Sequence, residues 1–249
     1  MDHTEKLSLA HDLAARMGEK HGDALLVGGL IGAVARGDDT SFSDLDMVFV
    51  ARAGSGVEGR FLLFQGVPVH LIVADAAELE AELRGPGLSW PYWMGVLEVL
   101  QPMLGDPAHL QRWRSLGMAS DAQTFRVTVE RLLPALALES YGRIRSCGLR
   151  RNARDAPALA LELVYELKTA LCLLNRRWVT RDYFAGVEQS FRFPLIPAGY
   201  AELALRLLDA RELEVIVDLA GQLMAAYWRL LAVEGAVVQN YQKLEQLPL

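Results

Sequence analysis

The chain has only two cysteines among its 249 residues, and no histidine or second cysteine stands near either one. A disulfide framework and a zinc site are therefore not expected. An excess of basic residues is also missing, because 25 Lys and Arg residues face 31 Asp and Glu residues, for a net charge of −6. Binding along a nucleic-acid backbone usually requires a basic face, so nucleic acid is not the partner that we expect.

Long hydrophobic segments are absent as well. The longest uninterrupted apolar run covers residues 24–35, which is too short to cross a bilayer and contains three glycines. The first residues, Met1-Asp2-His3-Thr4-Glu5-Lys6, show no signal-peptide pattern. We therefore expect a cytoplasmic protein without a membrane span. With 52% hydrophobic and 22% charged residues, the chain has enough apolar surface for a folded core.

The apolar pattern changes character near residue 120. Before that point, strand-like runs alternate with helix-period segments, and Asp75 is a suitable N-cap for a helix over residues 76–84. The expected strands cover residues 24–31, 46–51, 61–64 and 69–73, and the other expected helices cover residues 4–20, 93–100 and 108–116. We predict an α/β (α+β) domain with a small mixed sheet over residues 1–119.

The second half carries helix-period apolar residues almost throughout. The expected helices cover residues 121–149, 156–178, 180–191, 198–209 and 212–237. Leu133-Pro134 interrupts the first of them and predicts a kink or a helix restart there. We predict an all-α helical bundle domain over residues 120–249.

Ile31-Gly32-Ala33 and Asp44-Leu45-Asp46-Met47 carry the clearest chemical signal in the chain. A glycine turn ends one apolar run, and two carboxylates then stand two residues apart at the start of the next run. Alternate side chains of a strand share a face, so Asp44 and Asp46 are expected to point the same way. Neighbouring carboxylates repel unless a cation or a proton neutralises them, and Mg²⁺ suits such a pair beside substrate phosphates.

This pattern resembles the signature of the nucleotidyltransferase superfamily related to DNA polymerase β. That signature has an apolar residue and glycine, then Gly or Ser, and about ten residues later Asp, an apolar residue and Asp or Glu. Ten residues separate Ala33 from Asp44 here, whereas starting from Gly28-Gly29 would leave fourteen. The residues around Arg36 and Ser43 also look like small bacterial members. The helical half resembles, more loosely, the C-terminal domain of kanamycin nucleotidyltransferase-like proteins.

The resemblance implies a metal-dependent enzyme that moves a nucleoside monophosphate, with AMP from ATP as the expected case, onto a hydroxyl of a small molecule or protein. Asp44 and Asp46 would hold Mg²⁺ (or Mn²⁺). Backbone N–H groups at Gly32 and Ala33 would bind phosphates. Arg36 would add a charged hydrogen bond to a phosphate, and the resemblance places Ser43 beside the nucleotide as well.

Two positions depart from the family pattern. Ala33 stands where the family usually has a serine hydroxyl, and His70 stands where a third carboxylate is normal. Imidazole is a poor Mg²⁺ ligand, but its ordinary pKa suits it to act as a base toward the acceptor hydroxyl. In the kanamycin enzyme's family the base is a glutamate of the helical domain, for which Glu166 is the first candidate and Glu162 the second.

Other functions remain open at this stage. The departures at Ala33 and His70 favour, as an alternative, a catalytically impaired nucleotide-binding or regulatory protein that keeps the fold. Addition of nucleotides to RNA or DNA ends has one supporting feature, an arginine cluster at a helix end. Its members are Arg143, Arg145, Arg150, Arg151 and Arg154. The kanamycin family also makes a homodimer conceivable.

Overall fold

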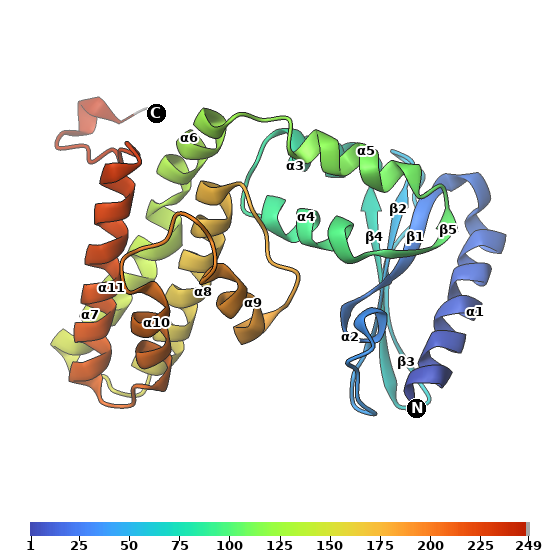
Figure 1. Cartoon of the computed structure of the whole chain (residues 1–249), viewed down its shortest axis with the longest axis horizontal. Helices are drawn as coiled ribbons and strands as arrows, with labels where there is room; N and C mark the ends of the chain where they lie inside the picture. Colours follow the sequence, from blue (N-terminus) through green and yellow to red (C-terminus); the bar gives the residue numbers. More distant parts are fainter. Residues whose placement is uncertain (248–249) are drawn as a thin grey trace. The chain divides into compact units, whose positions relative to one another are not determined.

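The computed structural model describes residues 1–247 and divides into two compact units. The N-terminal unit covers Met1–Ser120 and the C-terminal unit covers Asp121–Leu249. In Figure 1 the strands all belong to the first unit, and the second is helical among the described residues. The fold class predicted from the sequence is confirmed.

The N-terminal unit is built on a mixed five-stranded sheet in the order β3-β4-β2-β1-β5. Strands β2 and β4 pair in parallel, and the other neighbouring pairs are antiparallel. The strands are β1 (Leu25–Ile31), β2 (Leu45–Ala51), β3 (Arg60–Phe64), β4 (Val67–Asp75) and β5 (Gln101–Gly105). This order leaves β3 as one edge of the sheet, beside β4, and places β2 at its centre.

Five α-helices accompany the sheet within residues 1–120: α1 (His3–His21), α2 (Gly32–Arg36), α3 (Ala76–Arg84), α4 (Trp90–Val99) and α5 (Ala108–Gly117). Asp2 and Glu5 form a capping box that starts α1, so the first free N–H groups of this helix are satisfied. Asp75 accepts hydrogen bonds from the N–H groups of Ala77 and Glu78, as expected for the N-cap of α3.

Both faces of the sheet are covered over part of their length. Helix α1 packs on one face, where Ala10 and Ala14 join a buried cluster with Met47 and Phe49 of β2. Val48 of β2 alternates with these two residues and is equally buried on the opposite face. Helices α3, α4 and α5 pack together, and within this group α3 contacts β4 and α5 contacts β1. Figure 1 shows α1 and α4 on opposite sides of the sheet.

Strand β5 was not expected from the sequence. Its Pro102 argues against a strand, but β5 is an edge strand, where a missing backbone N–H is tolerated. Gly29 allows this strand to approach β1, because a Cβ at Gly29 would lie 1.9 Å from the carbonyl oxygen of Gln101. Gly29 is therefore a place where two backbones approach closely. At Gly28 the close neighbour is the Phe49 ring instead.

The C-terminal unit has six α-helices among its described residues: α6 (Ala122–Leu132), α7 (Glu139–Arg150), α8 (Ala156–Asn175), α9 (Tyr183–Ser190), α10 (Tyr200–Asp209) and α11 (Leu213–Val233). A π-helical segment, Pro134–Leu138, separates α6 from α7, so the expected single helix over residues 121–149 restarts at the proline. Helix α8 ends earlier than expected because Arg176 adopts a left-handed conformation. Helix α9 begins later than expected, at Tyr183.

Helix α11 is the one helix within residues 1–247 that is long and apolar enough for a membrane span. Its residues Ile216, Leu219, Ala220 and Leu223 are buried in the C-terminal unit at helical spacing. A core helix of a bundle meets the same length and composition criteria, so this helix is weak evidence for a membrane.

Candidate functional site

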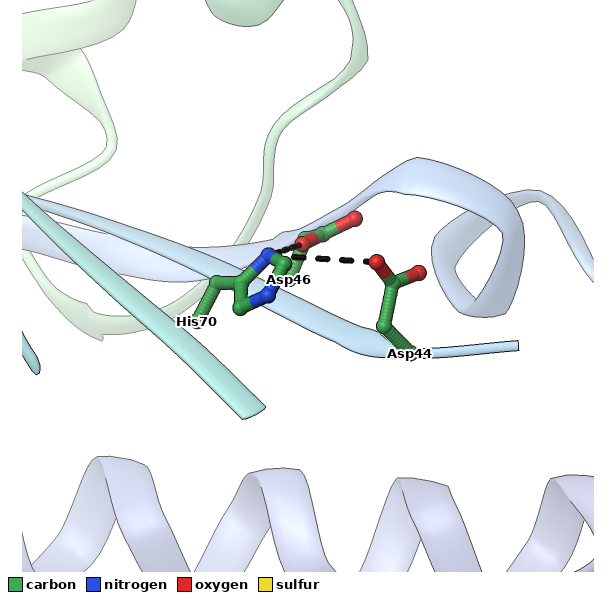
Figure 2. Close-up of side chains that lie close together, drawn as sticks. All are labelled: Asp44, Asp46 and His70. Carbon is green, nitrogen blue, oxygen red and sulfur yellow. Dashed lines mark ion pairs between the residues drawn. The ribbon is translucent and has the colours of Figure 1, made fainter. Parts of the chain in front are cut away.

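Three side chains meet at the start of β2. Asp46 is the second residue of β2, Asp44 directly precedes the strand, and His70 lies opposite Asp46 on β4. The His70 Nδ1 atom lies 2.8 Å from Asp46 Oδ1 and 3.8 Å from Asp44 Oδ2. Figure 2 shows both carboxylates directed toward the imidazole. The sequence therefore located three groups that the structure brings together.

This cluster fits a divalent cation by its donor atoms. One ligand atom from each residue lies within 4.8 Å of the other two, and all three side chains are partly exposed. Asp44 is the most open of the three at 43%, and Asp46 the least at 23%. The two carboxylates suit Mg²⁺ or Mn²⁺, whereas the imidazole of His70 is a weak ligand for Mg²⁺.

The glycine turn lies directly against this cluster. Gly32 has φ +74°, and a Cβ at this position would lie 2.7 Å from Asp46 Oδ2. Helix α2 begins at Gly32, and its N-cap residue, Ile31, contributes no side-chain hydrogen bond. The N–H groups in the first turn of a helix have no partner within the helix. The backbone N–H groups at Gly32 and Ala33 therefore lie beside the carboxylates and have no partner within the helix.

The two other predicted nucleotide-binding side chains are Arg36, the last residue of α2, and Ser43, which lies in the segment between α2 and β2. Arg36 forms an ion pair with Asp38 at 3.3 Å, and its side chain is 24% exposed. The Ser43 hydroxyl accepts a hydrogen bond from the Thr40 N–H at 2.9 Å. In the structure both side chains stabilise their own segment, and their roles toward a nucleotide stay predictions.

A buried ion pair that the sequence did not suggest anchors this same segment. Lys6 of α1 is fully buried and lies 3.2 Å from Asp39, whose side chain is 2% exposed. The Lys6 ammonium also donates to the Thr40 carbonyl, and His3 contacts the other Asp39 oxygen at 2.5 Å. Burial raises the pKa of Asp39, but the hydrogen bonds and charges of His3 and Lys6 lower it by more than burial raises it. The pKa of Asp39 is therefore lowered overall. The pair fixes the loop that leads to Asp44.

Glu166 belongs to α8 of the C-terminal unit. Burial raises the pKa of Glu166 to about 7, and the nearby charges of Glu162 and Glu139 add to this rise. Ser140 and Arg143 oppose part of it. Glu166 Oε2 and Ser140 Oγ are buried without a partner at hydrogen-bond geometry. A carboxyl group with a pKa near 7 can exchange a proton at neutral pH.

Part of the arginine cluster lines a cavity of about 670 Å³ in the C-terminal unit. The arginines that contribute to it are Arg143, Arg150 and Arg154. Asn152 and Asp155 also line it, so its polar wall is mixed and not uniformly basic. Arg143 is additionally paired with Glu139 and, at 3.7 Å, with Glu162.

The mixed sheet, the glycine turn and the facing carboxylates together have the layout of a nucleotidyltransferase domain, and a helical unit follows it. No protein-family model matches the chain. Comparison with curated proteins finds the aminoglycoside nucleotidyltransferase (4′) of Staphylococcus aureus. It is 21% identical over 210 residues, which make up 82% of this chain and 80% of that protein.

The structure is similar to that of a nucleotidyltransferase-like protein from Exiguobacterium sibiricum. The TM-score is 0.53 at 15% sequence identity, and the match covers 92% of this chain and 75% of the other. At this identity the structural likeness establishes the fold. Together the two similarities support assignment of the chain to the nucleotidyltransferase superfamily, and the resemblance found in the sequence is confirmed.

Proposed function

We propose that this protein is a metal-dependent nucleotidyltransferase that transfers a nucleoside monophosphate, with ATP as the donor, to a hydroxyl of a small molecule or protein. The observation that carries the proposal is the cluster of Asp44, Asp46 and His70 beside the turn at Gly32. Two carboxylates and the adjacent N–H groups in the first turn of a helix are the groups that a metal–triphosphate complex needs.

Each residue of the cluster has a separate task in this proposal. Asp44 and Asp46 hold Mg²⁺ or Mn²⁺, which when bound supplies positive charge to the reacting phosphate. The backbone at Gly32 and Ala33 binds the β- and γ-phosphates, and Arg36 and Ser43 add contacts to the nucleotide. The acceptor oxygen forms a bond to the α-phosphorus while the bond to the bridging oxygen breaks and pyrophosphate leaves.

The hydroxyl proton needs a base. Glu162, the second glutamate candidate from the sequence, pairs with Arg143 and is 44% exposed. We therefore propose Glu166 or His70 for this role. Glu166 is favoured because its pKa of about 7 leaves a large deprotonated fraction at neutral pH together with useful basicity. His70 is the alternative to Glu166 because its Nδ1 already lies 2.8 Å from Asp46, within the carboxylate cluster. The two assignments differ in which variant loses activity, Glu166→Gln or His70→Gln.

A non-catalytic nucleotide-binding or regulatory protein is the alternative. His70 favours it, because an imidazole contributes no negative charge to a metal site that normally has three carboxylates. Calorimetry with ATP and Mg²⁺ separates the two possibilities. Binding without pyrophosphate release, across a broad panel of acceptors, would support the alternative.

Addition to nucleic-acid ends has the cavity lined by Arg143, Arg150 and Arg154 as its support. Its test is affinity for single-stranded RNA that falls steeply with salt. We further propose a cytoplasmic location, and a homodimer stays a prediction that analytical ultracentrifugation can test.

The proposal is tested by pyrophosphate release from ATP with Mg²⁺ or Mn²⁺ in the presence of a panel of hydroxyl compounds. Asp44→Asn should abolish release, because the amide keeps the shape of the side chain and loses the charge that holds the metal. Asp12→Asn, on the exposed side of α1, is the matched control and should retain full activity. Unchanged activity in Asp44→Asn would refute the mechanism.

A further inference from the structure

The candidate site continues across the sheet to its edge. Asp46 on β2 pairs with His70 on β4, and His70 pairs with Phe61 on β3. Residues directly opposite each other on neighbouring strands point to the same face of a sheet. Phe61 therefore stands in one row with the Asp–His cluster, and its ring contacts the imidazole edge-on, with centroids 4.9 Å apart.

This end of the row is apolar and open to solvent. Phe61 is 80% exposed, and Leu63, two residues further along the same face, is 74% exposed. Large apolar side chains side by side on an edge strand are costly to leave in water and often mark a binding surface. Phe61 and Leu63 together form an apolar platform.

The two ends of this row of residues differ in what lies beside them. On its other side, Asp46 pairs with Ile31, which directly precedes the Gly32 turn. In the proposed function this turn binds the phosphates that leave as pyrophosphate. Because the attacking and leaving oxygens lie roughly in line across the phosphorus, the acceptor has to approach from the side opposite the turn. That side is the one occupied by His70 and Phe61.

We infer that the apolar platform of Phe61 and Leu63 binds the body of the acceptor, and that this acceptor carries an aromatic or other apolar group next to its reactive hydroxyl. The inference rests on the proposed function, whose acceptor it specifies. Offset or edge-on stacking against Phe61 and contact with Leu63 would position the hydroxyl beside the cluster. The platform thus determines specificity, and neither of its residues takes part in bond making.

This chemistry differs from what the name of the curated relative implies for that relative. Aminoglycosides are polycations, and a site for them needs carboxylates around the acceptor. The strand beside the cluster offers two uncharged side chains on the relevant face, and the one charged residue of β3, Arg60, points to the other face, since it alternates with Phe61. A polycation therefore lacks partners at this edge.

The chain provides matched controls within the same strand. Phe64 and Leu62 lie on the opposite face of β3 and are each 45% exposed. Phe64→Ala and Leu62→Ala therefore remove the same side chains as Phe61→Ala and Leu63→Ala, from the face away from the cluster. Leu63→Ala also distinguishes loss of the apolar platform from disturbance of His70, because this substitution keeps the contact between the Phe61 ring and the imidazole.

The test uses naphthylethanol, an aryl alcohol, and kanamycin, a polycation, as probes of the full-length protein by saturation-transfer NMR. We expect naphthylethanol to bind the wild type more tightly than kanamycin does. Phe61→Ala should weaken naphthylethanol binding about fivefold and Leu63→Ala about threefold, while both control variants stay within about twofold. Equal losses on both faces, or kanamycin binding more tightly, would overturn the inference.

Two further measurements keep the causes apart. Mn²⁺–ATP binding, followed by electron paramagnetic resonance, should be retained in Leu63→Ala and lost in Asp44→Asn. If the platform and control variants bind naphthylethanol equally well while Mn²⁺–ATP binding is intact, only the inference about the platform is refuted. If Asp44→Asn binds Mn²⁺ as tightly as the wild type does, the proposed function is refuted. Sedimentation of wild type and Phe61→Ala completes the set. A dimer that this substitution dissociates would assign the strand to contact between two copies and overturn the inference.

Discussion

Both units of this protein contain candidate functional carboxylates, which are solvent-accessible in the first unit and partly buried in the second. Asp44 and Asp46 lie at the open end of a strand, and both face the imidazole of His70. Glu166 lies midway along α8, with one oxygen buried and unpartnered, and its pKa is raised to about 7. Carboxylates that are accessible and close together are arranged to bind a cation, and a desolvated one is arranged to hold a proton. On this difference we propose metal binding for Asp44 and Asp46 and proton transfer for Glu166.

The largest expected effect comes from removing a proposed metal-binding carboxylate of the N-terminal unit. Asp46→Asn should reduce nucleotidyl transfer at least about 1,000-fold, because the amide cannot replace the charge that a divalent cation requires. Circular dichroism should show an unchanged fold. Steady-state pyrophosphate release measures the effect, and Asp12→Asn on α1 is the control. Transfer within tenfold of wild type would remove Asp46 from the mechanism.

Glu166→Gln tests the proposed role of the C-terminal unit in proton transfer. Transfer should fall about 100-fold, and the acidic limb of the pH–rate profile, set by a group with a pKa near 7, should disappear. Glu162→Gln is the control, because Glu162 is more exposed and pairs with Arg143. A retained acidic limb in Glu166→Gln, with its loss in His70→Gln, would move the base to His70.

The same residue predicts a pH dependence of stability. The pKa of Glu166 is raised in the folded state from 4.5 to about 7, so folding favours the neutral carboxyl. Its contribution is fully present below pH 4.5 and is lost as the pH rises through about 7. Glu166→Gln should therefore raise the free energy of unfolding at pH 8 and leave it unchanged at pH 4. The expected rise is on the order of 1–2 kcal/mol, less than the full pKa shift would give, because solvent screens a partly exposed carboxylate. Urea unfolding at the two pH values measures this, and an equal change at both would contradict it.

Two glycines sharpen the comparison within the N-terminal unit. Gly32 and Gly37 have similar positive φ angles, +74° and +71°, but only a Cβ at Gly32 meets a neighbour, Asp46 Oδ2. Gly32→Ala and Gly37→Ala should each cost about 1 kcal/mol of stability from backbone strain. Gly32→Ala alone should also weaken Mn²⁺ binding, by about tenfold. Calorimetric titration measures this, and equal Mn²⁺ affinity in the two variants would show that the turn and the carboxylate are not coupled.

The smallest expected effect concerns the departure at His70. His70→Asp restores a third carboxylate and should tighten Mg²⁺ binding about fivefold, because a hard cation prefers oxygen ligands. His11→Asp, on the exposed side of α1, is the control. A rise in transfer rate would indicate that His70 limits catalysis in the natural chain, and weaker Mg²⁺ binding would show that the imidazole belongs to the site.

The part of the site that depends on local sequence could be predicted. Asp44 and Asp46 are two residues apart, and the period of a strand alone makes them share a face. His70 followed from the resemblance, which fixes the neighbouring strand. Local patterns also gave the helix from Ala76 to Arg84 and the restart after Leu133.

Features that depend on distant contacts could not be predicted in this way. Strand β5 contains Pro102, and only its place at the edge of the sheet makes the proline acceptable. The Lys6–Asp39 pair joins residues far apart in the chain, and neither sits in a motif. Four consecutive apolar residues at 61–64 show no alternation, so nothing in the sequence indicated that Phe61 faces the cluster and Phe64 faces away.

The proposed function requires that Asp44 and Asp46 hold a divalent cation beside the Gly32 turn. The most direct measurement is anomalous diffraction from crystals soaked with Mn²⁺ and a non-hydrolysable ATP analogue. We expect a manganese peak within about 2.2 Å of an oxygen of each carboxylate, with the triphosphate at the N–H groups of Gly32 and Ala33. A triphosphate bound elsewhere, or no manganese between the two carboxylates at saturating concentration, would contradict it.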